Sequence, residues 1–391
     1  MEKVKLGDVS KLINGDRGKN YPSQADITED GEIPFVNAGH LNGREIDFSE
    51  MNFISQDKYD NLRSGKFQEG DILYCLRGSL GKKAFVSNDV NGAIASSLVI
   101  IRPDKEKVDG EYLMFALDSP AIKEQLVKAN NGSSQPNLSA ASVREYQVEL
   151  PNISIQKEVV EKLIKVRNII DCRRKELQLL DGFIKARFVE MFGDENNSLN
   201  WDIVNVEEVA DVQVGVVIKP SQYYTEKENG VPAFRSLNIG EGTIKDTDWV
   251  YFTNEGHEKN SKSILKENDL LIVRSGAPGT ACVVTKEYEG YNAIDIIIAH
   301  PDCSKVNPYY LCTYTNMPHG KKQIQEGTGG AAQQHFNVGK YNQLKLMLPP
   351  IERQNEFVDF IIQVNKSKST IQKALDETQL LFDSLMQKYF G

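Results

Sequence analysis

The chain of 391 residues is 40% apolar and 26% charged, the composition of an ordinary globular protein with room for two or three domains. Its net charge of −9, from 46 basic and 55 acidic residues, argues against a nucleic-acid-binding surface spread over the whole chain. No apolar run approaches the ~20 residues that cross a bilayer, and the start lacks a signal peptide, so we expect a cytoplasmic protein without membrane contact. Five scattered cysteines indicate reduced thiols.

The residue pattern of positions 1–150 is typical of a mixed α+β domain. "DILYCL" (71–76) and "SSLVIIR" (96–102) predict strands because they are rich in β-branched and aromatic residues. "EYLMFALDSPAIKEQL" (111–126) predicts one or two short helices, and "NAGHLNG", "LRGSLGKK" and "NNGSSQPN" predict loops.

A long helix is predicted for residues 151–193, because no proline and only Gly182 occur between Ile153 and Met191. Apolar residues alternate at spacings of four and three, the pattern of a coiled-coil seam. The seam positions are Val159, Leu163, Val166, Ile170, Arg173, Leu177, Leu180, Ile184, Arg187 and Met191.

The same order then occurs again. "LPNISIQKEVVEKL" at 150–163 returns as "LPPIERQNEFVDFI" at 348–361, which is 198 positions later. "GDILYCLRGSLGKKAFV" (70–86) and "ASSLVIIRPD" (95–104) are answered by "NDLLIVRSGAPGTACVV" (268–284) and "AIDIIIAHPD" (293–302). We therefore predict a tandem duplication, with a second mixed domain at 194–349 and a second helix at 350–391. The second seam is Phe357, Ile361, Val364, Lys368, Ile371, Leu375, Thr378, Phe382, Leu385 and Tyr389.

Each helix carries one narrow apolar stripe, so the simplest partner for either helix is the other. A duplicated unit packs on its copy about a pseudo-twofold axis, which makes the helices antiparallel. The predicted fold is thus α+β: two tandem mixed domains, each followed by a long helix of an antiparallel coiled coil. Arg173, Arg187 and Lys368 interrupt the seam, and either pair with acids across it or face a partner subunit.

The sequence contains no catalytic or metal-binding motif that we would defend. "GSLGKK" (78–83) lacks the spacing of a phosphate loop, and the acids of "PDKEK" (103–107) are too close together to come from separate strands. The five histidines lack metal-ligand spacing. We expect no catalytic residue, no metal and no cofactor bound by this chain.

The loops do carry hydrogen-bonding side chains at matching places in both copies. Arginine pairs with guanine and asparagine or glutamine with adenine in the major groove, while lysine and serine fit phosphate oxygens. The candidate DNA-contacting residues are Asn37, His40, Asn42, Arg44, Arg77, Ser79, Lys82, Lys83, Ser133, Ser134, Gln135, Asn137, Arg235, Ser236, Asn238, Arg274, Ser275, Thr280, Gln333, Gln334, His335 and Asn337.

The order of these phrases resembles the specificity subunits of type I restriction-modification systems. The resemblance rests on "KLGDV" (5–9), "IPFVNAGHL" (33–41), "GDILYCLRGSLGK" (70–82), "SSQPNLS" (133–139) and the repeated Leu-Pro-helix phrase, and it covers essentially the whole chain. "GGAAQQHFN" (329–337) matches "SSQPNLS" poorly, which makes the base contacts there less secure.

The resemblance implies two target recognition domains that read a bipartite site in double-stranded DNA. It implies that the helices set the gap between half-sites and dock two methyltransferase subunits. Adenosylmethionine and ATP would then be bound by methyltransferase and restriction (translocase) partners. Two other hypotheses stay open: a protein interaction scaffold with two globules on a coiled-coil rod, and an enzyme with a site built across both globules.

Overall fold

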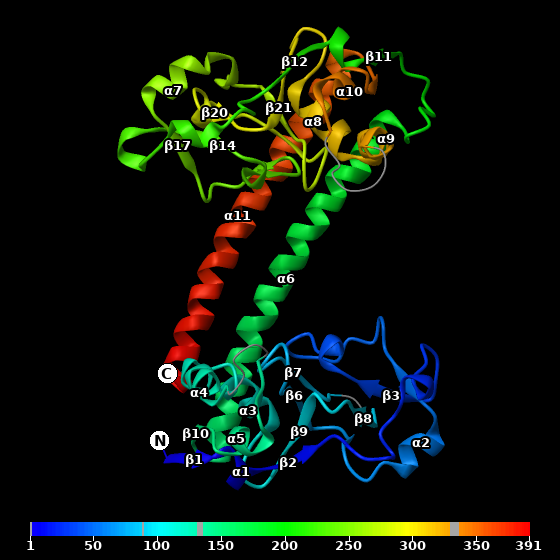
Figure 1. The fold of residues 1–391 in the computed structure, drawn as a ribbon, viewed down its shortest axis with the longest axis vertical. Coiled ribbons are helices and arrows are strands. Elements are labelled where there is room, and N and C mark those ends of the chain that lie inside the picture. Colours follow the sequence, from blue (N-terminus) through cyan, green and yellow to red (C-terminus); the bar gives the residue numbers. More distant parts are fainter. Residues whose placement is uncertain (1, 88–89, 131–135, 329–335) are drawn as a thin grey trace. The chain divides into compact units, whose positions relative to one another are not determined.

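The computed structural model describes residues 2–87, 90–130, 136–328 and 336–391, and it divides into two compact units. Unit 1 comprises Met1–Arg174 and Lys373–Gly391, and unit 2 comprises Lys175–Gln372. Each unit therefore contains one globular region together with parts of both long helices (Figure 1).

Unit 1 is built on two four-stranded sheets, ordered β2-β9-β6-β7 and β4-β3-β8-β5. The first is antiparallel, and the second contains one parallel pair, β3 with β8. Strands β1 and β10 pair separately. The elements are β1 (Glu2–Lys5), α1 (Leu6–Val9), β2 (Ser10–Asn14), β3 (Ile33–Val36), β4 (Phe53–Ile54), α2 (Gln56–Asn61), β5 (Lys66–Phe67), β6 (Ile72–Cys75), β7 (Lys83–Phe85), β8 (Gly92–Ile94), β9 (Leu98–Pro103), α3 (Gly110–Ala116), α4 (Pro120–Ala129), α5 (Ala140–Arg144) and β10 (Gln147–Leu150).

The central strand β6 and the first four residues of β9 are apolar and fully buried, as expected of strands that are covered on both faces. Ile72 and Ile101 face a core shared with α3, α4 and α6, whereas Leu73 and Ile100 face a core shared with the second sheet. The strands predicted from "DILYCL" and "SSLVIIR" are thus confirmed, as are two helices over 111–126.

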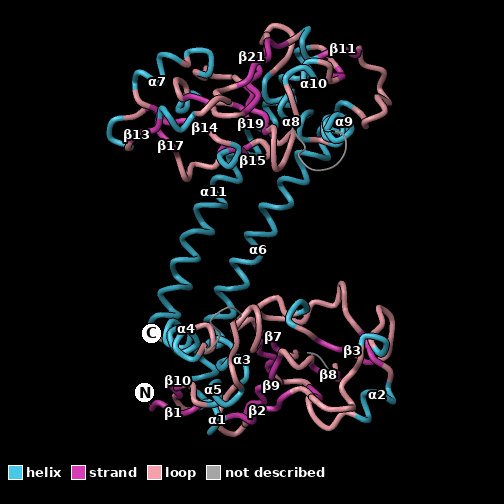
Figure 2. The backbone as a smooth tube through the Cα atoms, viewed as in Figure 1, coloured by secondary structure: helices cyan, strands magenta, loops and turns pink. Residues whose placement is uncertain are grey.

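Unit 2 repeats this plan, with sheets ordered β12-β21-β18-β19 and β13-β17-β14-β20 and again one parallel pair, β14 with β20. It adds a small hairpin, β15-β16. Figure 2 shows the same mixture of helices, strands and loops in each unit. The elements are β11 (Ile203–Asn205), β12 (Ala210–Val214), β13 (Tyr224–Thr225), β14 (Val231–Phe234), β15 (Ile239–Gly240), β16 (Thr243–Ile244), β17 (Val250–Phe252), α7 (Asn254–Lys259), β18 (Leu270–Val273), β19 (Ala281–Val283), β20 (Asn292–Ala293), β21 (Ile296–Pro301), α8 (Pro308–Asn316), α9 (Pro318–Thr328), α10 (Val338–Asn342) and β22 (Lys345–Met347).

The two long helices, α6 (Ile153–Phe192) and α11 (Ile351–Phe390), each have 40 residues. Within each unit they contact one another and run antiparallel. In unit 1, Arg167 of α6 lies 5.2 Å from the ring centre of Phe382, and Arg173 donates to the carbonyl of Ala374. In unit 2, the rings of Phe183 and Phe360 are 5.1 Å apart.

Every predicted seam residue is buried or half-buried, including the three charged ones. Lys368 reaches Asp181 across the helix pair at 2.5 Å, and Arg187 lies 3.8 Å from Glu356. Arg173 instead bonds the carbonyl of Ala374 and the hydroxyl of Thr378. Two of the three charges therefore pair with acids across the seam, while supercoiling of the helices stays a prediction.

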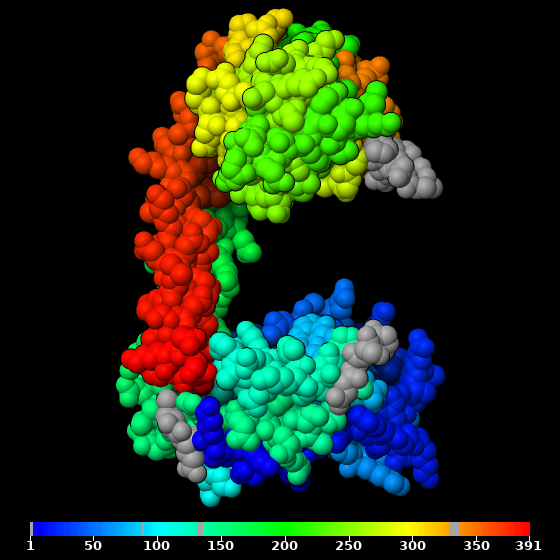
Figure 3. Space-filling view, turned by 60° about the vertical axis from the view of Figure 1, so that its left-hand side comes forward, coloured from blue at the N-terminus to red at the C-terminus, as the bar shows by residue number. Residues whose placement is uncertain are grey.

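The ends of both helices also contribute residues to the globular cores, which the seam pattern does not predict. Phe188 and Phe192 in the last turns of α6 belong to the core of unit 2, where each packs against Phe357 with ring centres 5.4 Å apart. Met386 and Phe390 at the end of α11 belong to the core of unit 1. Figure 3 shows the red end of α11 in contact with the rest of that unit. Each helix end is thus an integral part of a globular core.

Candidate nucleic-acid interface

Three of the loops that carry the candidate residues meet in unit 1. The amide of Gly78 donates to the carbonyl of Pro136 (3.3 Å), and the ammonium group of Lys82 donates to the carbonyl of Ala38 (3.0 Å). The amide of Phe85 donates to the carbonyl of Arg44 (2.6 Å). Residues 37–44, 76–83 and 136–138, which are far apart in the sequence, therefore form one continuous surface.

The corresponding loops of unit 2 are joined in the same way. The amide of Phe336 donates to the carbonyl of Arg274 (3.0 Å), and the amide of Gly242 donates to the carbonyl of Ala281 (2.9 Å). Arg274 pairs with Asp295, and Arg235 donates to the carbonyl of Asp248. Both aspartates have a left-handed backbone, at φ +51° and +52° respectively, a conformation that residues other than glycine adopt rarely and that is common at functional sites.

Several candidate residues hold their own loop in shape. Asn37 caps a 3-10 turn through the amide of Gly39 (2.7 Å), and its own amide donates to Nδ1 of His40 (3.1 Å). Arg235 and Asn238 repeat the second of these bonds in unit 2, where the main-chain amide of Arg235 donates to Oδ1 of Asn238 (2.9 Å). His40 and Asn238 are both buried, and burial lowers the pKa of His40. Their positions favour a structural role over a DNA contact.

Lys83 is buried as well, and its ammonium group pairs with Asp118. Burial lowers the pKa of Lys83, while the carboxylate of Asp118 opposes that shift. We therefore assign Lys83 to the interior of unit 1, beside the interface.

Arg44 belongs to a cluster of charged and aromatic residues under the interface of unit 1. It pairs with Glu111 at 2.6 Å and lies 5.6 Å from the ring centre of Phe115. Arg167 of α6 lies on the same ring at 4.4 Å, and its burial lowers its pKa. This cluster ties the loop at 37–44 to the long helix.

Unit 2 is open at the corresponding place. Gly242, Thr313 and Asn365 stand where unit 1 has Arg44, Phe115 and Arg167. All three line a cavity of about 570 Å³. The two copies therefore share their framework and differ in how the loop is fastened to the helix.

The remaining candidates divide by exposure. The exposed ones are Asn42, Arg77, Ser79, Asn137 and Asn337, and the half-buried ones are Asn37, Arg44, Lys82, Arg235, Ser236, Arg274, Ser275 and Thr280. Asn42 accepts from the amides of Arg44 and Glu45, and Asn337 caps α10 by accepting from the amide of Lys340. Ser133, Ser134, Gln135, Gln333, Gln334 and His335 lie outside the described residues.

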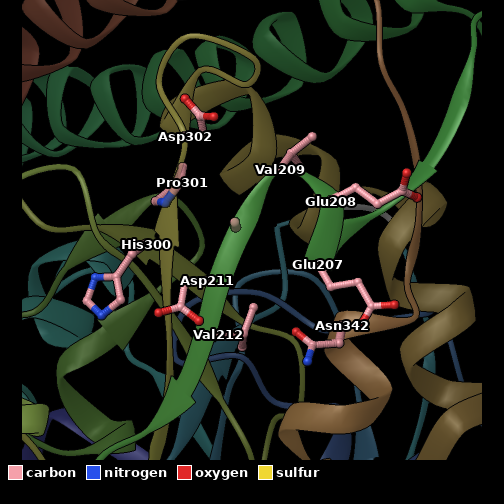
Figure 4. Close-up of a pocket in the computed structure, with 10 residues that line it drawn as sticks. Glu207, Glu208, Val209, Asp211, Val212, His300, Pro301, Asp302 and Asn342 are labelled. Carbon is pink, nitrogen blue, oxygen red and sulfur yellow. The ribbon is translucent and has the colours of Figure 1, made fainter.

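One pocket of unit 2 is acidic and therefore unsuited to bind DNA. It has a volume of about 400 Å³ and is lined by Glu207, Glu208, Asp211, Asp302 and His300, with Asn342 at its edge (Figure 4). Its carboxylates would repel phosphate, so it is no part of the interface. Among the described residues, no group of three His, Cys, Asp or Glu could hold a metal ion, and no helix is long and apolar enough to cross a membrane.

The sequence reasoning missed the segment that follows the first long strand of each unit. Arg17 and Lys19 are exposed after β2. The guanidinium group of Arg17 donates to the carbonyl of Ser96 (3.5 Å), two residues before β9. The corresponding residues after β12 are Val217 and Lys219, and both are exposed, as is Ile218 between them. The available signal was a glycine, Gly15 or Gly215, directly after each strand.

Comparison with known proteins finds one family and relatives that match nearly the whole chain. The model of the type I restriction modification DNA specificity domain matches twice, at residues 1–181 and 198–378. The specificity subunit of the type I restriction enzyme MjaVIII from Methanocaldococcus jannaschii is 22% identical over 95% of this chain and 89% of that protein. The EcoKI specificity subunit from Escherichia coli is 20% identical over 98% and 88%.

Two solved structures have a similar fold. The S subunit of a type I restriction-modification system from M. genitalium superposes with a TM-score of 0.58 at 14% identity, covering 100% of this chain and 96% of that one. A chain from a structure that describes complex assembly and conformational transition of a type I system gives 0.60 at 19% identity, covering 100% and 97%.

Proposed function

This chain belongs to the type I restriction modification DNA specificity family, and from that premise we propose how it reads DNA. DNA sequence recognition by two tandem domains follows from the family. We propose that each unit reads one half of a bipartite site through the loop surface described above. The two long helices then set the gap between the half-sites.

The observation that carries this proposal is the contrast between a shared framework and different loops. Both units join the same loops by main-chain hydrogen bonds, yet the side chains that these loops present differ. Unit 1 presents Arg77, Ser79 and Asn137 to solvent, whereas unit 2 presents Asn337 at the related place and holds Arg274 half-buried behind it. Two readers of different sequences require this combination of constant positioning and variable contacts.

Partner subunits complete the proposal. Part of the outer face of the helices in unit 2 is apolar: Leu179 and Phe183 are 63% and 54% exposed, and they line a cavity of about 650 Å³ with Ile371. We propose that two methyltransferase subunits dock on the helices and that restriction subunits join them. Those partners would bind adenosylmethionine and ATP, and this chain would be non-catalytic. Partner subunits that surround the DNA would also supply the positive charge that this chain, with its net charge of −9, lacks.

A base-resolution map of adenine methylation in the source genome tests the proposal most directly. Strains with and without this chain would be compared. We expect the loss of one split motif, two short half-sites around a fixed run of unspecified bases. An unchanged map in a strain where the methyltransferase genes are expressed would contradict the proposal and favour a protein scaffold.

A further inference from the structure

Two exposed apolar residues follow the first long strand of unit 2. Val217 and Ile218 are 48% and 79% exposed, so neither contributes a full side chain to a core. The preceding residue, Val216, is 9% exposed and packs with Phe252. The apolar side chains therefore change from buried at Val216 to exposed at Val217, the next residue.

The backbone on which these residues stand is firmly held. The amides of Gly215 and Val216 donate to the carbonyls of Ile296 (2.9 Å) and Ala293 (2.8 Å). A Cβ atom on Gly215 would lie 2.2 Å from the carbonyl oxygen of Ala293, so only glycine permits this close approach. The segment is thus fixed against the connection between β20 and β21, and its exposed side chains project from a defined position.

That position borders the candidate interface. The amide of Asp295 donates to the carbonyl of Val216 (3.1 Å), and the carboxylate of Asp295 pairs with Arg274. Arg274 in turn donates from Nε to the carbonyl of Phe336 (3.2 Å). One chain of contacts therefore connects the apolar pair to the loops that carry the candidate DNA-contacting residues.

Unit 1 has different chemistry at the same place. After Gly15 it carries Asp16, Arg17, Gly18 and Lys19, and the two cations are exposed. Such cations suit phosphate oxygens. In unit 2, Val217 and Ile218 replace Arg17 and Gly18, and only Lys219 is kept. An apolar pair at the edge of a DNA-binding surface matches one feature of the major groove, the C5 methyl group of thymine.

We infer that Val217 and Ile218 contact the methyl group of a thymine in the half-site read by unit 2. The inference rests on the proposed function, because it names one contact of the same surface. It makes these residues determinants of specificity, and it requires at least one A·T pair in that half-site.

Deoxyuridine tests this contact because it differs from thymidine only in lacking the C5 methyl group of the base. Once the split motif is known, binding of the full chain, with its methyltransferase partners, is measured on duplexes in which each thymine is replaced in turn. One replacement in the half-site of unit 2 should weaken binding by about three- to fivefold, the effect of one buried methyl group. Ile218→Ala combined with Val217→Ala should weaken binding to the thymine duplex similarly and remove the dependence on uridine.

The controls separate this contact from general effects. Ile203→Ala, at a residue of unit 2 that is 56% exposed on β11, should leave binding and the uridine effect unchanged. Thermal unfolding checks that the double variant is folded. The inference is overturned if no thymine shows the effect, if the effect survives in the double variant, or if the half-site has no A·T pair. Loss of all sequence preference in the unaltered chain would instead refute the proposed function itself.

Discussion

At the scale of single residues, two arginines that resemble each other in sequence occupy different positions. Strand β6 ends at Cys75 and β18 ends at Val273, so Arg274 corresponds to the buried Leu76, and Arg77 lies one position further along. Arg77 is exposed, whereas the side chain of Arg274 is 16% exposed and is bonded to Asp295 and Phe336. Arg77 is therefore exposed where a base edge could be reached, and Arg274 supports the loop.

Alanine substitutions should separate these roles. Arg77→Ala should leave the free energy of unfolding unchanged and weaken binding by about 1–3 kcal/mol for one half-site only. Arg274→Ala should lower the free energy of unfolding by about 1 kcal/mol, because the partly exposed Asp295 loses its charged partner and the carbonyl of Phe336 loses a donor. Denaturant titration and binding to duplexes with each half-site altered would measure both. Equal weakening of binding to all sequences by Arg77→Ala would assign that residue to phosphate.

At the scale of elements, one glutamine in each copy connects the start of the long helix to a short helix. Gln156 is fully buried, accepts from the amide of Asp109 (2.8 Å) and donates to the carbonyls of Lys107 and Pro151. Gln354 repeats all three bonds with Asn307, Lys305 and Pro349. Asp109 and Asn307 are the N-caps of α3 and α8, so each glutamine fixes the entry of a long helix against its domain.

Replacement of either glutamine by alanine should lower the free energy of unfolding by about 2–4 kcal/mol, because buried polar groups lose their partners. Gln178→Ala, on the exposed face of α6, is the matched control and should change stability by less than about 0.5 kcal/mol. Chemical denaturation of the full chain measures both variants. A cost at Gln156 no greater than at Gln178 would show that the duplicated bonds are not what holds the helix in place.

The sequence predicted those elements whose signals are local. The long stretches without proline located both helices to within a residue or two, and the apolar runs located β6, β9, β18 and β21. The insertion of Phe188 and Phe390 into domain cores was missed, because the partners of each are far away in the sequence. For the same reason the candidate list mixed side chains that turn out buried, such as Asn238, with exposed ones such as Arg77. Loop composition predicts polarity, but only the fold decides which side faces solvent.

At the scale of the whole molecule, both connections between the units run through helix. Unit 1 gives way to unit 2 after Arg174 within α6, and unit 2 gives way to unit 1 after Gln372 within α11. Helix has a fixed rise per residue, so the proposed function predicts that helix length at these two connections sets the distance between half-sites.

Deletion of one heptad from each helix, residues 174–180 and 369–375, tests this relation. It removes about 10 Å of helix and keeps the seam in register, so both half-sites should persist while the gap shortens by about three base pairs. Methylation mapping in a strain that carries the variant measures the gap. Deleting five residues from each helix instead is the control, because it turns each apolar stripe by about 140° away from its partner and should abolish the motif. If the seven-residue deletion left the gap unchanged, the distance between half-sites would have to be set by the partner subunits or by the DNA.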